Sequence, residues 1–220
     1  MTTTVRRIAF TMVSRLTMRR QPSPPACGVV ASDVMGHAPW RVFLSHTSEL
    51  RSQPAERSFA AAAEAAIIRA GHAITDMAYF AARDADSAQL CTAMVARADV
   101  YVCIVGGRYG EPVPSRPAQS FTELEFATAT GLGLPRLAFL VREDTPCLTP
   151  TDEPAEHRLR QSAFRDRLRR SGLTLGHVST PADLELGLLQ ALAELRTESV
   201  ALAAFRAAAT AAASGAPILW

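Results

Sequence analysis

Val100-Tyr101-Val102-Cys103-Ile104-Val105 is the stretch of sequence that decides the fold. All six residues are apolar or aromatic, as in a strand that is buried on both faces of a parallel sheet. Segments with helical periodicity lie on either side of this run, at about 87–98 and 121–131. Alternation of apolar strands with helices is typical of an α/β domain with a parallel sheet.

The same alternation continues outward in both directions. We expect four further strands, at 41–45, 72–77, 137–141 and 175–178, and further helices at about 54–70, at 155–170 and from Pro181 onward. Five strands with a helix after each predict a flavodoxin-like, three-layer α/β sandwich with a five-stranded parallel sheet in the order 2-1-3-4-5. Such sheets bind ligands at the carboxyl ends of the strands where the order reverses, here the strands at 41–45 and 100–105.

Composition divides the chain into three segments. Residues 1–39 carry five arginines, no acid before Asp33 and a proline-rich run at 21–25, which predicts a disordered tail or an upstream start codon with Met35 as the true beginning. An arginine-rich targeting leader is the alternative. Residues 40–197 form the predicted domain. Residues 198–220 form an alanine-rich helix or linker, with either a break near Thr197 or an extension that led into another domain.

The absence of lysine excludes several activities. All 23 basic residues are arginine, so the chain has neither a phosphate-binding P-loop lysine nor a Schiff-base lysine. The formal net charge is only +2. Asp166 interrupts the basic run at 157–170 and Glu156 directly precedes it, and we therefore expect no nucleic-acid partner.

The cysteine spacing argues against metal binding. No C-x-x-C pair and no histidine at ligand spacing accompany the four cysteines, which are Cys27, Cys91, Cys103 and Cys147. We expect reduced thiols, a cytoplasmic protein and no metal site. No stretch approaches the ~18 apolar residues of a membrane span, so we expect no membrane partner.

Two loops at the expected reversal predict a nucleotide-binding site. Ser45, His46 and Thr47 follow the first strand, and Gly106, Gly107, Arg108 and Tyr109 follow the central one. The backbone amides of the two glycines, with Arg108 or Arg51, could receive a pyrophosphate. Because G-x-G-x-x-G is absent, the glycines fit plain turn residues equally well. His46 fits either an acid or base or a residue that caps its loop.

The helix at 121–131 carries two carboxylates with different expected roles. Ser120 and Glu123 have the spacing of a capping box, which gives Glu123 a structural role. At 100° per residue, Glu125 lies at the edge of the predicted inward stripe, which consists of Phe121, Leu124, Thr128 and Leu132. Glu125 is therefore the candidate for the cleft, and a solvated flank is the alternative.

Three linked motifs resemble the bacterial TIR-like domains of unassigned function. They are Phe43-Leu44-Ser45-His46 followed by Thr47-Ser48-Glu49, the central strand ending in Gly-x-Arg-Tyr-Gly, and Ser120-x-Thr-Glu-x-Glu followed by Gly133-x-Pro135. The resemblance covers residues 41 to about 195 and implies a TIR-like fold. It also implies a homo-oligomer when active and a STAND-type signalling NTPase as partner or as a lost fused domain, because such domains commonly precede STAND-type NTPases.

The resemblance also implies an activity. In TIR domains that cleave NAD, a glutamate on the helix after strand three is catalytic, and Glu125 matches that position. The resemblance therefore implies a signalling or defence effector that hydrolyses the N-glycosidic bond of NAD. NAD would be its substrate, and it would need no cofactor. No tryptophan lies near Glu125, so Phe121 or Tyr109 would have to stack on nicotinamide. A non-enzymatic oligomerisation or adaptor module and a nucleoside-processing transferase are the alternatives.

Overall fold

The structure is a computed structural model that describes residues 38–75, 87–145 and 153–213. The expectations about the N-terminal tail and about Met35, Cys27 and Cys147 lie outside the described residues.

A five-stranded parallel sheet forms the centre of the domain. Its strands are β1 (Arg41–His46), β2 (Ala73–Thr75), β3 (Val100–Val105), β6 (Arg136–Val141) and β7 (Leu175–Val178), in the order β2-β1-β3-β6-β7. Numbered within the sheet alone, this order is 2-1-3-4-5, which confirms the predicted fold class. Every residue of β3 is buried, and Val102 pairs with Leu44 of β1 and Leu137 of β6.

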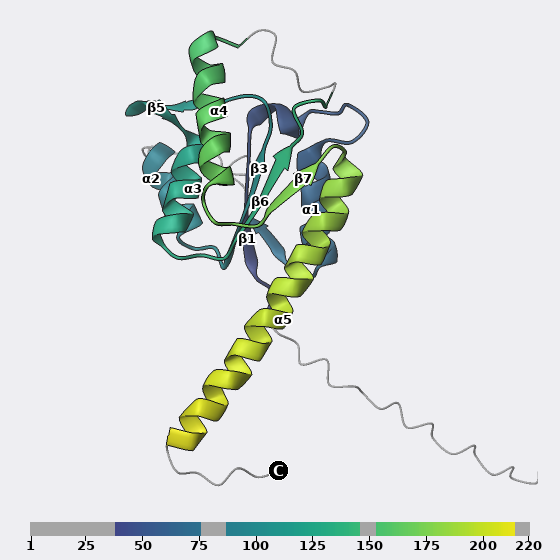
Figure 1. Cartoon of the computed structure of the whole chain (residues 1–220), viewed down its shortest axis with the longest axis vertical. Helices are drawn as coiled ribbons and strands as arrows, with labels where there is room; N and C mark the ends of the chain where they lie inside the picture. The colour runs from purple at the N-terminus through teal and green to yellow at the C-terminus, as the bar shows by residue number, and fades with distance from the viewer. Residues whose placement is uncertain (1–37, 76–86, 146–152, 214–220) are drawn as a thin grey trace, which may run out of the picture. The chain divides into compact units, whose positions relative to one another are not determined.

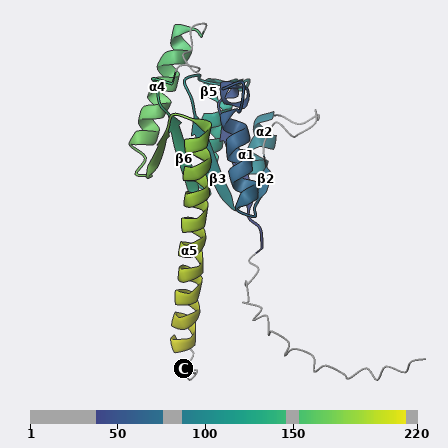
Figure 2. The same cartoon turned by 90° about the vertical axis from the view of Figure 1, so that its right-hand side faces the viewer.

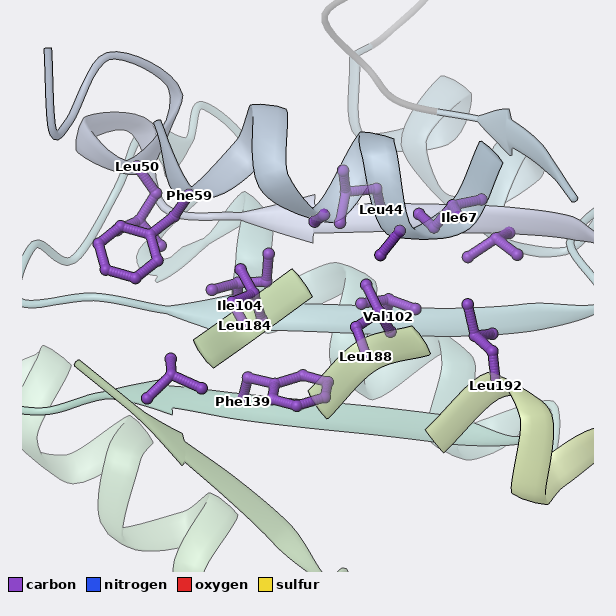
Figure 3. Close-up of a cluster of buried hydrophobic side chains, with 14 of the residues drawn as sticks. Leu44, Leu50, Phe59, Ile67, Val102, Ile104, Phe139, Leu184, Leu188 and Leu192 are labelled. Atoms are coloured by element: carbon purple, nitrogen blue, oxygen red, sulfur yellow. The ribbon is translucent and has the colours of Figure 1, made fainter. Parts of the chain in front are cut away.

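Helices cover both faces of the sheet, which makes three layers (Figures 1 and 2). On one face lie α1 (Phe59–Arg69) and α5 (Pro181–Ala213), and on the other lie α2 (Ser87–Val95), α3 (Phe121–Gly131) and α4 (Ala155–Arg169). Figure 3 shows the first face, where side chains of the sheet meet the apolar stripes of α1 and α5. The helical spacing of Phe59, Ala63, Ile67 and Ala70 in α1, and of Leu184, Leu188, Ala191, Leu192 and Leu195 in α5, predicts inward stripes; Ala70, Ala191 and Leu195 are partly buried and the other six are buried.

Two elements begin later than predicted. The sequence predicted a helix from Pro54, but α1 begins at Phe59 because the side chain of Ser58 accepts the amide N–H of Ala61 and so caps the first turn. Before it, residues Ser48–Arg51 form a short 3-10 helix, η1. β2 begins at Ala73, one residue after the predicted start.

The sequence missed a hairpin between β3 and α3. Residues 106–119 are rich in glycine and proline, which predicts a loop. In the structure, however, β4 (Pro112–Val113) and β5 (Arg116–Ser120) pair antiparallel within this region. Proline lacks the N–H that a ladder needs, so proline-rich segments read as loops, but a short two-stranded edge tolerates it. The hairpin leads directly into α3 and forms one wall of the site described below.

α3 is capped as predicted but is buried on a different face. Ser120 and Glu123 form the reciprocal capping box. The predicted stripe is wrong at its end, where Leu132 is 51% exposed, whereas Glu123, Glu125 and Ala129 are buried.

The reason lies in two partners distant in sequence. The Tyr109 hydroxyl and the Arg167 guanidinium both donate hydrogen bonds to the Glu123 carboxylate. They cover a flank that an isolated helix would expose to water. Glu125, on another side of the helix, is buried against Ser45 of β1 and Cys91 of α2.

α5 has no break near Thr197 and instead continues to Ala213. Its first half packs on the sheet and on α1, whereas Val200, Leu202 and Phe205 in the second half are exposed (Figure 1). None of the helices in the described part of the chain has both the length and the apolar character that a membrane span requires.

We expect Glu123→Ala to destabilise the domain by about 2 kcal/mol, because it removes the cap and one buried acceptor of the Tyr109 hydroxyl. Glu123→Gln should cost about 1 kcal/mol, because the amide keeps the reach of the cap but loses the charge beside Arg167. Urea unfolding measures both. Glu156→Ala, which removes a mostly exposed carboxylate from α4, is the control; a loss for Glu123→Ala no larger than for this control would contradict the burial argument.

Removal of the residues after Thr197 should leave the thermal midpoint within about 2 °C of the full chain, because Val200, Leu202 and Phe205, the large apolar side chains in its described part, are exposed. Thermal unfolding followed by circular dichroism at two protein concentrations measures this. A loss of more than about 4 °C would mean that this part of α5 is covered, and a loss only at high concentration would assign the cover to a second copy.

Candidate functional site

A cavity of about 430 Å³ opens beside the carboxyl end of β1. This is the place that the strand order predicts for a ligand. Four parts of the chain build it: the end of β1 with η1, the start of α2, the hairpin and its approach, and the first turns of α3. The lining residues are Leu44, Ser45, His46, Ser48, Arg51, Ser87, Gly110, Glu111, Pro114, Phe121, Thr122 and Glu125.

Glu125 contributes a held carboxylate to the wall of this cavity. Its side chain is only 6% exposed. The Ser45 hydroxyl donates to Oε2 at 2.5 Å, and the Cys91 thiol donates to Oε1 across 3.4 Å. Residues of β1 and α2 therefore orient the one glutamate that the sequence selected.

His46 and Arg51 bring positive and neutral polar groups to the same cavity. The His46 Nδ1 atom lies 3.0 Å from the carbonyl oxygen of Thr47, and Nε2 lies 3.2 Å from a guanidinium nitrogen of Arg51. A carbonyl only accepts and a guanidinium only donates, so this geometry places the imidazole proton on Nδ1. Both ring nitrogens are engaged, which fits the loop-capping interpretation of His46. Arg51 also lies 3.6 Å from Glu64.

The two aromatic candidates occupy different environments. Phe121 lines the cavity, so its ring is available to a ligand. Tyr109 is fully buried, and its hydroxyl lies 2.8 Å from the carbonyl oxygen of Ala118 and also bonds Glu123. Burial and the adjacent Glu123 carboxylate raise the pKa of Tyr109 to about 12. Tyr109 thus supports α3 from behind rather than facing a ligand.

The loop after β3 uses its backbone amides internally. The N–H of Gly106 donates to Thr47 Oγ1, and that of Arg108 to Glu49 Oε1, each at 3.0 Å. The N–H of Tyr109 donates to Glu153 Oε1 at 3.0 Å. The structure therefore brings Ser45 and His46 to the cavity, whereas Thr47, Gly106, Gly107, Arg108 and Tyr109 are not among the residues that line it.

Sequence reasoning missed the carboxylate that organises this loop. Glu49 accepts hydrogen bonds from the Thr47 hydroxyl and the Arg108 amide, and burial raises its pKa. The sequence signal was weak, since a Thr-x-Glu spacing after a strand says nothing about a partner 59 residues away.

Sequence reasoning also missed the role of α2 at the site. The sequence predicted only a reduced, buried thiol at Cys91. Cys91 is buried, but its thiol also faces the Glu125 carboxylate. Burial first, and then the Glu125 charge, raise the pKa of Cys91. Ser87, one turn earlier on α2, lines the cavity directly.

The arrangement can stabilise positive charge that develops on a bound molecule. It places the Glu125 carboxylate, an aromatic ring from Phe121 and the cationic Arg51 on the wall of a single cavity. A cavity of this volume falls in the ordinary range for small-molecule sites. Within residues 38–75, 87–145 and 153–213, no three His, Cys, Asp or Glu side chains are grouped as metal ligands.

Comparisons with known proteins give a matching family and a distant structural likeness. No curated protein matches the sequence. The fold is similar to the TIR domains of the activated Roq1 resistosome directly recognizing the pathogen effector XopQ, with 13% identity and a TM-score of 0.37. That match covers 70% of this chain and 83% of the other. At this level the likeness decides nothing about function.

A family model matches residues 41–193, which include β1, the central strand, α3 and every residue that lines the cavity. The matched region covers well over half of the chain. The chain therefore belongs to the family described as a domain of unknown function, DUF4062.

Proposed function

We propose that this chain is a TIR-like signalling or defence effector domain that binds NAD and hydrolyses its N-glycosidic bond with Glu125. The single observation that carries the proposal is the Glu125 carboxylate, which is buried, bonded on both oxygens and lines a cavity at the reversal of the strand order. The motif resemblance supports the same residue independently.

The chemistry needs a carboxylate beside the anomeric carbon. The bond between ribose C1′ and the nicotinamide nitrogen breaks, and its electron pair leaves with nicotinamide, which becomes neutral. The sugar then passes through an oxocarbenium-like state, which the negative charge of Glu125 stabilises. A water oxygen adds at C1′ and loses a proton to solvent, which gives ADP-ribose.

Other residues of the cavity have supporting roles in this proposal. Phe121 offers the aromatic face for nicotinamide. Arg51 supplies the positive charge for the pyrophosphate, since the amides of the loop after β3 are bonded to Thr47, Glu49 and Glu153. The Ser45 hydroxyl holds Glu125 rather than the ligand.

A non-enzymatic assembly module is the second candidate. One observation favours it: the second half of α5 exposes Val200, Leu202 and Phe205. Self-association in solution, together with no heat of NAD binding by calorimetry, would support this candidate over the enzyme.

Glu125→Gln should lower NAD hydrolysis by at least about a hundredfold, because the neutral amide cannot stabilise the developing cation. Nicotinamide release from concentrated protein, followed by chromatography, measures it. Glu111→Gln changes another carboxylate that lines the cavity and should keep most of the activity.

Equal turnover by the wild type and Glu125→Gln, or none by either after the protein is clustered on a bead surface, would refute the enzymatic proposal. Free nucleosides are tested in parallel. Glu125-dependent cleavage of nucleosides with no loss of NAD would instead identify a nucleoside-processing transferase.

A further inference from the structure

The Glu125 carboxylate receives hydrogen bonds from two buried neutral donors on different elements. Ser45 of β1 reaches Oε2 and Cys91 of α2 reaches Oε1. Ser45 and Cys91 are 2% and 0% exposed, so neither donor exchanges freely with water. A carboxylate bonded on both oxygens has its plane fixed, whereas one bond would leave it free to rotate.

The sulfur of Cys91 is the donor in its bond. An ionised carboxylate can only accept, so the proton must lie on the thiol. Burial and the charge of Glu125 raise the pKa of Cys91 above its usual value, which keeps the thiol protonated at neutral pH. A thiol in this state is a poor nucleophile, so reactivity does not explain its position.

The place of Cys91 on α2 links the carboxylate to the cavity wall. Ser87 precedes Cys91 by four residues, one helical turn, so both lie on the same face of α2. Ser87 lines the cavity and Cys91 lies against Glu125. One face of α2 therefore contacts the ligand space and the carboxylate together.

A second buried thiol nearby offers a natural comparison. Cys103 pairs with Ser45 across the β1–β3 register and is also fully buried. Burial raises the pKa of Cys103 to about 12, so this thiol is protonated as well. Cys91 bonds the Glu125 carboxylate, whereas Cys103 packs in the core between the sheet and α2, α3 and α4, where Tyr101, Glu125 and Ser45 also act on its pKa.

We propose that Cys91 is a positioning residue whose thiol hydrogen bond fixes and favours the ionised carboxylate of Glu125. The proposal rests on the proposed function for its catalytic consequence, but the bond itself is measurable without substrate. A hydrogen bond to the charged form of an acid favours that form, so loss of the thiol must make Glu125 easier to protonate.

The test follows the side-chain carboxyl carbon of Glu125 by NMR during an acid titration of glutamate-labelled protein. The signal is identified by its loss in Glu125→Gln. Cys91→Ala should move the titration midpoint of this signal upward by about one pH unit. Cys91→Ser, which restores a donor, should recover at least half of that change.

Cys103→Ala is the control, because it deletes the same atom from another fully buried cysteine, which lies in a different apolar cluster from Cys91. It should move the midpoint by less than a third as much as Cys91→Ala. An unchanged midpoint in Cys91→Ala, or equal changes in the two alanine variants, would overturn the proposal, since equal changes would reflect packing and not the bond.

The catalytic consequence is measured separately. If the wild type hydrolyses NAD, the pH midpoint of the acid limb of its activity profile should be higher in Cys91→Ala, by the same amount as the NMR titration midpoint. The acid-limb midpoint of Cys91→Ser should lie between those of the wild type and Cys91→Ala. If the wild type has no turnover, the proposed function fails, but the titration still decides whether Cys91 positions Glu125.

Discussion

The backbone of Gly106 is the constraint on which the site depends. Its N–H donates to Thr47 Oγ1, and its carbonyl oxygen accepts from Gln161 at 2.8 Å and from Arg165 at 3.0 Å. A Cβ at this position would lie 2.1 Å from Glu49 Oε1, which is far inside contact distance. A side chain at this position would displace the Glu49 carboxylate, whose Oε1 accepts from the Thr47 hydroxyl and the Arg108 amide, so glycine lets the loop after β3 keep its bonds to η1.

This constraint decides which groups remain for a ligand. Amides at the end of a strand are expected to bind phosphate in many α/β proteins. Here the carboxylates of Glu49 and Glu153 accept hydrogen bonds from the amides of Arg108 and Tyr109. These internal carboxylates therefore take the place that the sequence predicted for the pyrophosphate of a ligand. The ligand space is consequently bounded by β1, the hairpin and α3, where side chains rather than backbone donors line the wall.

The features that the sequence could predict are those that depend on residues close together in the chain. The buried run at β3, the strand order and the capping box at α3 depend on periodicity or on residues three positions apart, so they were predictable. The α3 face was predicted wrongly because Arg167, 44 residues from Glu123, covers one flank. The bond from Arg165 to Val105 spans 60 residues and leaves no local pattern. Glu125 was found through helical phase and family motif, but its contact with Cys91 was not.

A partly buried carboxylate, Glu49, and a buried one, Glu125, flank this region, and position separates their roles. Burial raises the pKa of Glu49, which by itself would mark a candidate acid or base. The Oε1 atom of Glu49, however, accepts hydrogen bonds from the Thr47 hydroxyl and the Arg108 amide. Glu49 is also not among the residues that line the cavity. Glu125 is more deeply buried than Glu49 and lines the cavity. The raised pKa of Glu49 reflects burial alone, and only contact with the ligand space makes a carboxylate a candidate for chemistry.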